Sequence, residues 1–177
     1  MEFTFRPAIE SLSKNNAYVS WSFTPGVAVG PLRFGMTREQ VKDTMSKWVT
    51  KFGLPENFQP KLFRKSKTSV SDTEDWHVMH LYYSASDKLE AVEVWGNKGF
   101  SISCPIFTSK PMDVKLFQVI PTNLNTIIRG FAAFSPTISL DVGEGAIVAK
   151  PLSMAIAFGA EYKSVDSCMF GARGYFK

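Results

Sequence analysis

The stretch GPLRFGMTREQV, residues 30–41, is where an extended segment gives way to a helix. Thr37 and Gln40 have the spacing of a capping box, in which each side chain satisfies a free backbone amide at the start of a helix. Glu39 suits the positive end of the helix dipole. The stretch has too few glycines, and no Lys-Ser/Thr pair, for a phosphate-binding loop. It therefore predicts a strand-to-helix joint.

The predicted helix has one apolar stripe, and a short strand precedes it. Its apolar residues recur at helical spacing: Val41, Met45, Trp48, Val49 and Phe52. Gly53 and Pro55 are expected to end the helix. Leu32 and Phe34, two positions apart ahead of the joint, share one face of the strand. This pattern predicts a helix that buries one side against a sheet.

The rest of the chain resembles a repeat of this unit. Strands are predicted at residues 61–67, 75–83, 89–95, 137–142, 146–149 and 152–158, with a hairpin turn at 84–88. A last strand includes residues 163–166 and ends in FGARGY (170–175). A second strand and helix are predicted within residues 116–130. WGNKGF (95–100) and FGARGY (170–175) both have the form aromatic-Gly-x-basic-Gly-aromatic. The predicted fold is a single α+β domain over residues 1–177, with two related strand-helix-antiparallel meander halves, roughly 17–100 and 112–177, sharing one core.

Composition narrows the class of protein. The 177 residues are 45% hydrophobic and 20% charged, which is ordinary for a globular domain. No apolar run approaches the roughly 20 residues of a membrane span, and the N-terminal residues lack the apolar core of a secretory signal. We therefore expect a cytoplasmic protein. Two cysteines, Cys104 and Cys168, make neither a disulfide framework nor a zinc site, and are expected to be reduced core residues.

Charge is unevenly distributed along the chain. The net charge of +4 combines a balance of +6 over residues 33–67 with a balance of −5 over residues 72–93. Net charge is therefore a poor guide to what the protein binds, because each stretch could attract a different partner.

Motifs for catalysis or metal binding are weak. His77 and His80 lie three apart in a predicted strand, so they would face opposite ways and could not readily share a metal. The same argument separates Glu90 from Glu93. No serine sits in a Gly-x-Ser-x-Gly elbow, and residues 141–145 predict a tight turn rather than a calcium loop. We expect a protein that is not an enzyme and carries no cofactor or metal.

The joint, written Gly-hydrophobic-Gly-Met-Thr-x-Glu-x-Val, resembles one found in small bacterial α+β proteins. These include immunity proteins of contact-dependent growth inhibition and similar polymorphic toxin systems of bacterial competition, as well as outer-membrane assembly lipoproteins. The clear match covers about 20 residues. The resemblance implies a cytoplasmic immunity protein, a toxin inhibitor that acts by protein–protein interaction with its cognate toxin, without catalytic residues. Such toxins are often nucleases.

Two sets of residues are candidates for partner binding. A basic nuclease cleft would suit the acidic hairpin and its aromatic residues, so the predicted contacts are Asp72, Glu74, Asp75, Trp76, Tyr83, Asp87, Glu90 and Glu93. If the toxin is itself acidic, the basic stretch at 33–67 would be the interface instead. The alternative function is a nucleic-acid-binding module that uses this stretch and the two glycine turns. Its contacts would be Lys61, Arg64, Lys65, Lys67, Lys98 and Arg173.

Overall fold

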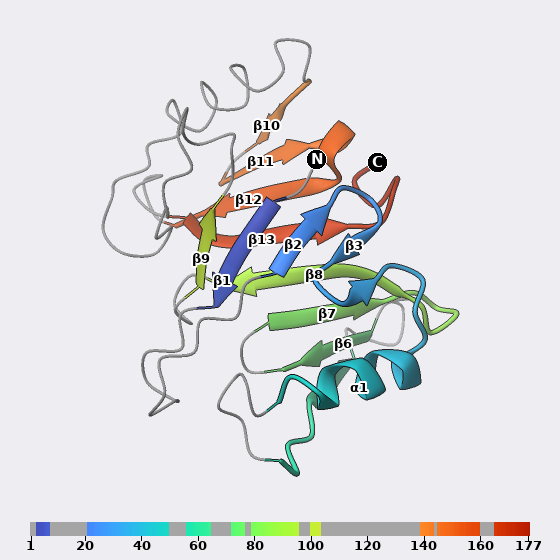
Figure 1. The fold of residues 1–177 in the computed structure, drawn as a ribbon. Coiled ribbons are helices and arrows are strands. Elements are labelled where there is room, and N and C mark those ends of the chain that lie inside the picture. The colour runs from blue at the N-terminus through green and yellow to red at the C-terminus, as the bar shows by residue number, and fades with distance from the viewer. Residues whose placement is uncertain are drawn as a thin grey trace.

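Two antiparallel sheets pack against each other in the computed structural model. One α-helix packs on the larger sheet beside the smaller one and adds to the same core (Figure 1). The structure describes residues 3–7, 21–49, 56–64, 72–76, 79–95, 100–103, 139–143, 145–159 and 165–177. The larger sheet has the strand order β10-β11-β12-β13-β8-β7-β6-β5, and the smaller sheet has the order β4-β3-β2-β1-β9.

The larger sheet consists of two meanders joined through their last strands. One meander contains β5 (Lys61–Arg64), β6 (Asp72–Asp75), β7 (Met79–Tyr83) and β8 (Leu89–Trp95). The other contains β10 (Asp141–Gly143), β11 (Ala146–Ala149), β12 (Met154–Phe158) and β13 (Val165–Gly171), with a 3-10 helix η3 at Lys150–Leu152. β8 and β13 pair antiparallel, so the two meanders form one continuous sheet.

The smaller sheet covers one face of the larger one. Its strands are β1 (Phe3–Pro7), β2 (Trp21–Thr24), β3 (Ala28–Val29), β4 (Leu32–Arg33) and β9 (Phe100–Ser103). Figure 1 shows β1, β2 and β9 in front of the larger sheet. The ring of Phe23 on β2 lies 4.5 Å from the ring of Phe170 on β13, and both are fully buried. We call the covered side of the larger sheet the core face and the opposite side the back face.

Helix α1 (Arg38–Ser46) begins as predicted. Thr37 accepts a hydrogen bond from the Gln40 amide at 3.2 Å, and the Gln40 side chain accepts one from the Thr37 amide at 2.9 Å. The preceding joint is tied to the larger sheet, because the Gly35 amide donates to the Leu89 carbonyl at 2.8 Å. Gly35 has a φ of +88°, which a side chain at this position would disfavour. The joint thus fixes α1 beside the start of β8.

The α1 cap gives a first testable prediction. We expect Thr37→Ala to destabilise the protein by about 1 kcal/mol, since it leaves an amide of the first turn without its acceptor. Thr44→Ala is the matched control, because the Thr44 hydroxyl only donates to a carbonyl within the helix. Urea unfolding measures both. Equal losses for the two variants would contradict a role for the cap.

The predicted fold class is wrong. The protein is mostly β, and α1 is the single α-helix of the described residues, so it is not a balanced α+β fold with a helix in each half. The prediction assumed that a helix covers the sheet in each half. Instead, the meanders bury their core face largely against a second sheet. One hydrophobic cluster nonetheless joins residues of both meanders, α1 and the smaller sheet. The second helix expected within 116–130 lies outside the described residues.

Several element boundaries also differ from prediction: the strand expected at 137–142 is β10, and the one expected at 152–158 is the shorter β12 after η3. The single strand expected at 75–83 is the end of β6 and all of β7, which pair antiparallel with Asp75 opposite His80. The chain reverses between them, and the Trp76 amide donates to the Met79 carbonyl at 2.9 Å. Helix α1 stops at Ser46, well before Gly53, yet Val49 in the following turn stays buried. The apolar stripe therefore extends beyond the helix itself.

Candidate functional site

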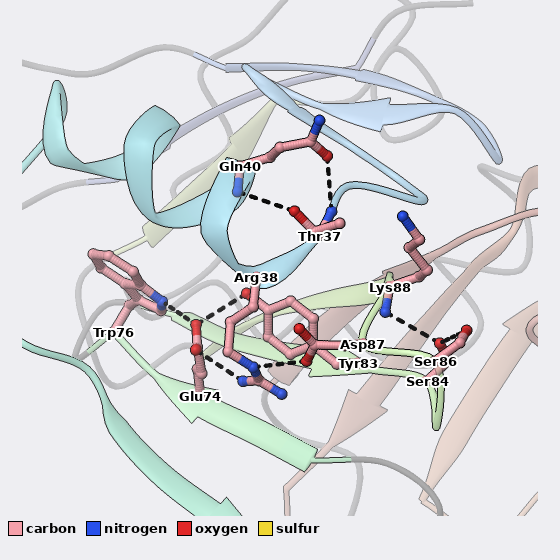
Figure 2. A network of polar contacts seen from close by, with 10 residues as sticks. All are labelled: Thr37, Arg38, Gln40, Glu74, Trp76, Tyr83, Ser84, Ser86, Asp87 and Lys88. Carbon is pink, nitrogen blue, oxygen red and sulfur yellow. Dashed lines mark hydrogen bonds and ion pairs between the residues drawn. The ribbon is translucent and has the colours of Figure 1, made fainter.

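A buried carboxylate, Glu74, organises the polar side chains beneath α1 (Figure 2). Its Oε1 accepts from the Arg38 guanidinium at 2.8 Å. Its Oε2 accepts from the Trp76 indole at 3.1 Å and from the Tyr83 hydroxyl at 2.9 Å. Both oxygens are thus satisfied, which a buried charged group requires. We call Arg38, Glu74, Trp76, Tyr83 and Asp87 the Glu74 cluster.

Arg38 joins this cluster to the tip of the β7–β8 hairpin. Its Nε donates to Asp87 Oδ1 at 2.9 Å, and its guanidinium lies 3.9 Å from the centre of the Tyr83 ring. Burial alone would lower the pKa of Arg38, but the hydrogen bonds and charges of Glu74 and Asp87 raise it overall. Arg38 therefore stays charged, and it clamps α1 to β6 and to the hairpin.

The hairpin tip is held by its own hydrogen bonds as well. The Lys88 amide donates to the Ser84 hydroxyl at 3.2 Å, and the hydroxyl groups of Ser84 and Ser86 lie 3.0 Å apart. Asp87 has a φ of +59°, an uncommon left-handed conformation for a residue with a side chain. The contact with Arg38 helps to hold Asp87 there.

A second buried carboxylate, Glu93, lies on the back face at the centre of the larger sheet. Its Oε2 accepts from the Tyr82 hydroxyl on β7, and its Oε1 accepts from the Ser167 hydroxyl on β13 at 2.7 Å. The exposed fraction is 6% for Glu93 and 3% for Ser167. This contact bridges three adjacent strands, including the pair that joins the two meanders.

Tyr175 lies on the same back face, close to Glu93. Gly171 makes room for it, because a Cβ there would lie 2.8 Å from the Tyr175 Cβ. Burial raises the pKa of Tyr175, and the charges of Glu90 and Glu93 raise it further. The expectation that Glu90 and Glu93 face opposite ways assumes a regular strand, whereas the β7–β8 register shifts at Tyr82 and Tyr83. Glu90 is the extra residue at this bulge, and both carboxylates act on Tyr175.

These buried tyrosines predict alkaline instability. Burial first, and then the neighbouring glutamates, raise the pKa of Tyr82 and of Tyr83 well above the ordinary value. The side chain of an unfolded tyrosine ionises at about pH 10. The stability that these protonated tyrosines contribute is complete below that pH and is lost as pH rises toward the folded pKa, by about 1.4 kcal/mol per pH unit for each. Urea midpoints from pH 8 to pH 11.5 measure this loss.

The control for this pH dependence is a variant in which Tyr82 and Tyr83 are both phenylalanine. It should lose less stability between pH 10 and pH 11.5 than the unaltered protein, although it begins from a lower value. Parallel slopes for the two proteins would contradict the assignment to these side chains.

One buried hydroxyl of the described residues has no hydrogen-bond partner. Thr73 on β6 is 4% exposed, and its Oγ1 is the unsatisfied atom. Burying an unpaired hydroxyl costs about 1–3 kcal/mol. Thr73→Val should therefore stabilise the protein by about 1 kcal/mol, measured by urea unfolding. Ser167→Ala, which removes a hydroxyl that does have a partner, should destabilise it. Destabilisation by Thr73→Val would show that this hydroxyl has a partner after all.

Four of the eight residues predicted to bind a partner lie inside the protein. Glu74, Trp76 and Tyr83 are buried in the Glu74 cluster, and Glu93 is buried on the back face. The more accessible ones include Asp87, which is already paired with Arg38, and Asp75, which lies 3.7 Å from His80 Nε2. Asp72 pairs with Tyr83 and Arg64 in the backbone register. Most of the acidic and aromatic side chains of this segment thus make contacts within the protein and are not free to bind a partner.

Of the residues predicted to bind nucleic acid, the ones that the structure describes do not form one patch. Lys61 is exposed on the edge strand β5, which also contains Arg64. Arg173 is exposed in the turn after β13, four strand spacings from β5, or about 19 Å across the sheet. Lys65, Lys67 and Lys98 lie outside the described residues.

The other chemical candidates are only partly covered by the structure. Cys168 is a fully buried core cysteine, as predicted, whereas Cys104 lies outside the described residues. His77 also lies outside them. No cluster of three or more metal-ligating side chains occurs in the described part of the chain. Within the same part, no helix has the length and apolar character needed to cross a membrane.

The surface feature that sequence reasoning missed is an apolar pair on β5. Leu62 and Phe63 are 50% and 49% exposed, although they are adjacent and both large. The sequence signal is the apolar pair within the basic segment KLFRK, whose mixture of bases and an aromatic residue indicates nucleic-acid binding and not a protein contact. Val142, on the opposite edge strand β10, is 47% exposed. The β5 edge is therefore the candidate functional site.

Comparison of the chain with protein-family models, with curated proteins and with solved structures gives no match. A functional proposal therefore has to be based on the exposure, charge and contacts of the described residues.

Proposed function

We propose that this protein is a non-enzymatic immunity protein that binds and neutralises a cognate toxin domain in the cytoplasm. The observation that carries the proposal is the exposed pair Leu62 and Phe63 on the edge strand β5. Large apolar side chains exposed on both faces of an edge strand are typical anchors for a partner that covers that edge. The resemblance of the strand-to-helix joint to immunity proteins supports the choice of partner.

The charge around this pair indicates which toxin surface would bind. Lys61 and Arg64 flank the pair on β5, so an acidic surface is the complementary one. The acidic residues of the 72–93 hairpin are a weaker candidate contact, because most of their side chains are already bonded within the protein. If the toxin is a nuclease with a basic cleft, the β5 edge would bind beside that cleft and not within it.

The proposal requires a toxin gene beside this one, and binding to the toxin domain of that gene product tests it. We expect a one-to-one complex by light scattering, and growth protection when the two are expressed together. Phe63→Asp should weaken the complex at least 100-fold by calorimetry. Val142→Asp is the matched control, because Val142 is similarly exposed on the other edge of the same sheet. Absence of a complex would refute the immunity function, and equal loss in both variants would refute the β5 contact.

A nucleic-acid-binding module is the second candidate. Lys61 and Phe63 are two positions apart on a strand, so they share one face, and a base beside an aromatic ring suits single-stranded nucleic acid. Such binding would weaken steeply with salt. Strongly salt-dependent retention on single-stranded RNA, lost in Lys61→Ala, together with no toxin complex, would favour this function.

A further inference from the structure

Among the described residues, β5 is an edge strand of the larger sheet. β5 ends the strand order of the larger sheet, with β6 on its inner side, and no described strand lies beyond it. Its first three side chains are all exposed. An edge strand presents unpaired backbone amide and carbonyl groups, which another extended segment can bond. No described strand pairs with the outer backbone groups of β5, so within the described part of the chain they can bond a partner as its side chains can contact one.

The inner neighbour of β5 shows which strand suits it. β6 has the sequence DTED, and the register places Asp75 opposite Lys61 and Asp72 opposite Arg64. Opposite charges across a strand pair stabilise the pairing by about 0.2–1 kcal/mol each. Lys61 also borders the outer side of β5, because a strand residue lies beside both neighbouring strands. The protein thus already pairs the basic strand β5 with one acidic strand, β6, and a second acidic strand would suit the other side of β5.

We propose that the outer edge of β5 accepts an extended acidic segment of the partner protein as an added strand. This inference rests on the proposed function for the identity of the partner, but its chemistry can be tested separately. Side chains of β5 alternate between faces, so Lys61 and Phe63 would contact the added segment on one face and Leu62 on the other. The segment that fits has acids at its ends and small or apolar residues between them, like β6.

A second copy of this chain is a poorer occupant of the edge. Antiparallel pairing of β5 with itself, centred on Leu62 and Phe63, would place Lys61 opposite Arg64 of the other copy at both ends. Like charges directly opposite each other destabilise a strand pair. An acidic segment from another protein avoids this repulsion.

A peptide titration tests the edge directly. The probe is the capped peptide SDTEDW, the sequence of residues 71–76, and its control is SKTKKW with the three acids replaced by lysine. Backbone amide shifts of the isotope-labelled protein are followed by NMR at low and at high salt. We expect the acidic peptide to shift the β5 amides and to bind at least tenfold more tightly than the control at low salt. Equal binding of both peptides, or shifts confined to other strands, would overturn the proposal.

Proline variants test whether the backbone takes part. Successive residues in a strand direct their amides to opposite sides, so one of Leu62 and Phe63 has its amide on the outer side. The proline variant at that position keeps the bonds to β6 and should stay folded. It should bind the acidic peptide at least tenfold more weakly than the alanine variant of the same residue. Equal binding by a folded proline variant and its alanine counterpart would overturn strand addition.

The two proposals fail in distinguishable ways. Selective peptide binding without a toxin complex would leave the edge site standing and refute the immunity function. A toxin complex in which hydrogen exchange of the β5 amides is unchanged would support the immunity function and refute strand addition at β5. The peptide titration uses the unaltered protein, so it decides the question even if a proline variant does not fold.

Discussion

Glu74→Ala is expected to destabilise the protein by about 3–5 kcal/mol, a large part of the 5–15 kcal/mol that stabilises a typical domain. The change removes the shared acceptor of three donors, on Arg38, Trp76 and Tyr83. Trp76 and Tyr83 are buried, so water does not replace the lost oxygen, and each unsatisfied donor costs about 1–3 kcal/mol. Urea unfolding at pH 7 measures the effect.

Two further variants isolate the role of the carboxylate. Asp87→Ala removes a more exposed partner of the same guanidinium and should cost less than about 1 kcal/mol. Glu74→Gln keeps one oxygen acceptor but removes the charge, so its loss should fall between the other two. If Glu74→Ala costs no more than Asp87→Ala, then Glu74 is not the organising residue of the cluster.

Phe170→Ala is expected to cost a similar 3–5 kcal/mol, for a different reason. Phe170 is among the largest fully buried side chains, and its ring packs on Phe23 where the smaller sheet meets the larger one. Truncation would leave a cavity at this contact, because β2 and β13 are each fixed by their own strand pairing. The free energy of unfolding should fall, and amide exchange in β2 should become faster.

Phe63→Ala is the matched control, since it deletes the same ring from a half-exposed position on β5. It should cost less than about 1 kcal/mol and leave exchange in β2 unchanged. A small loss for Phe170→Ala, with normal exchange in β2, would mean that the two sheets are held together elsewhere.

Local patterns predicted the local structure well. The capping box at Thr37 and Gln40, the β7–β8 hairpin and the strand 146–149 follow from spacing and turn chemistry over a few residues. The short strand expected just ahead of the joint is β4, but the rest of the smaller sheet could not be predicted this way. Its outer strands β3 and β4 have only two residues each, and β9 comes from a distant part of the chain.

The candidate site was harder to predict than the fold. A run of acids beside aromatic residues indicates a binding surface only if those side chains lack partners within the protein. Arg38, which pairs with Glu74, lies 36 positions earlier in the chain, so no local pattern reveals this contact. One signal was present in the sequence. Glu74 and Trp76 are two positions apart, so a strand would direct both toward the same face, and a tryptophan favours the buried one.

The pairing of β8 with β13 has a consequence for how the protein reaches its native state. Residues that face each other across this pair, such as Trp95 and Ser167, are 72 positions apart. Contacts at such separation are entropically costly to close, and they slow folding. Until β13 arrives, one edge of β8 is unpaired, and the apolar side chains of Val92 and Val94 lack part of their cover. The centre of the larger sheet is therefore completed last, when β13 pairs with β8. A chain that has not yet been synthesised as far as β13 exposes this strand edge, which favours aggregation and chaperone binding.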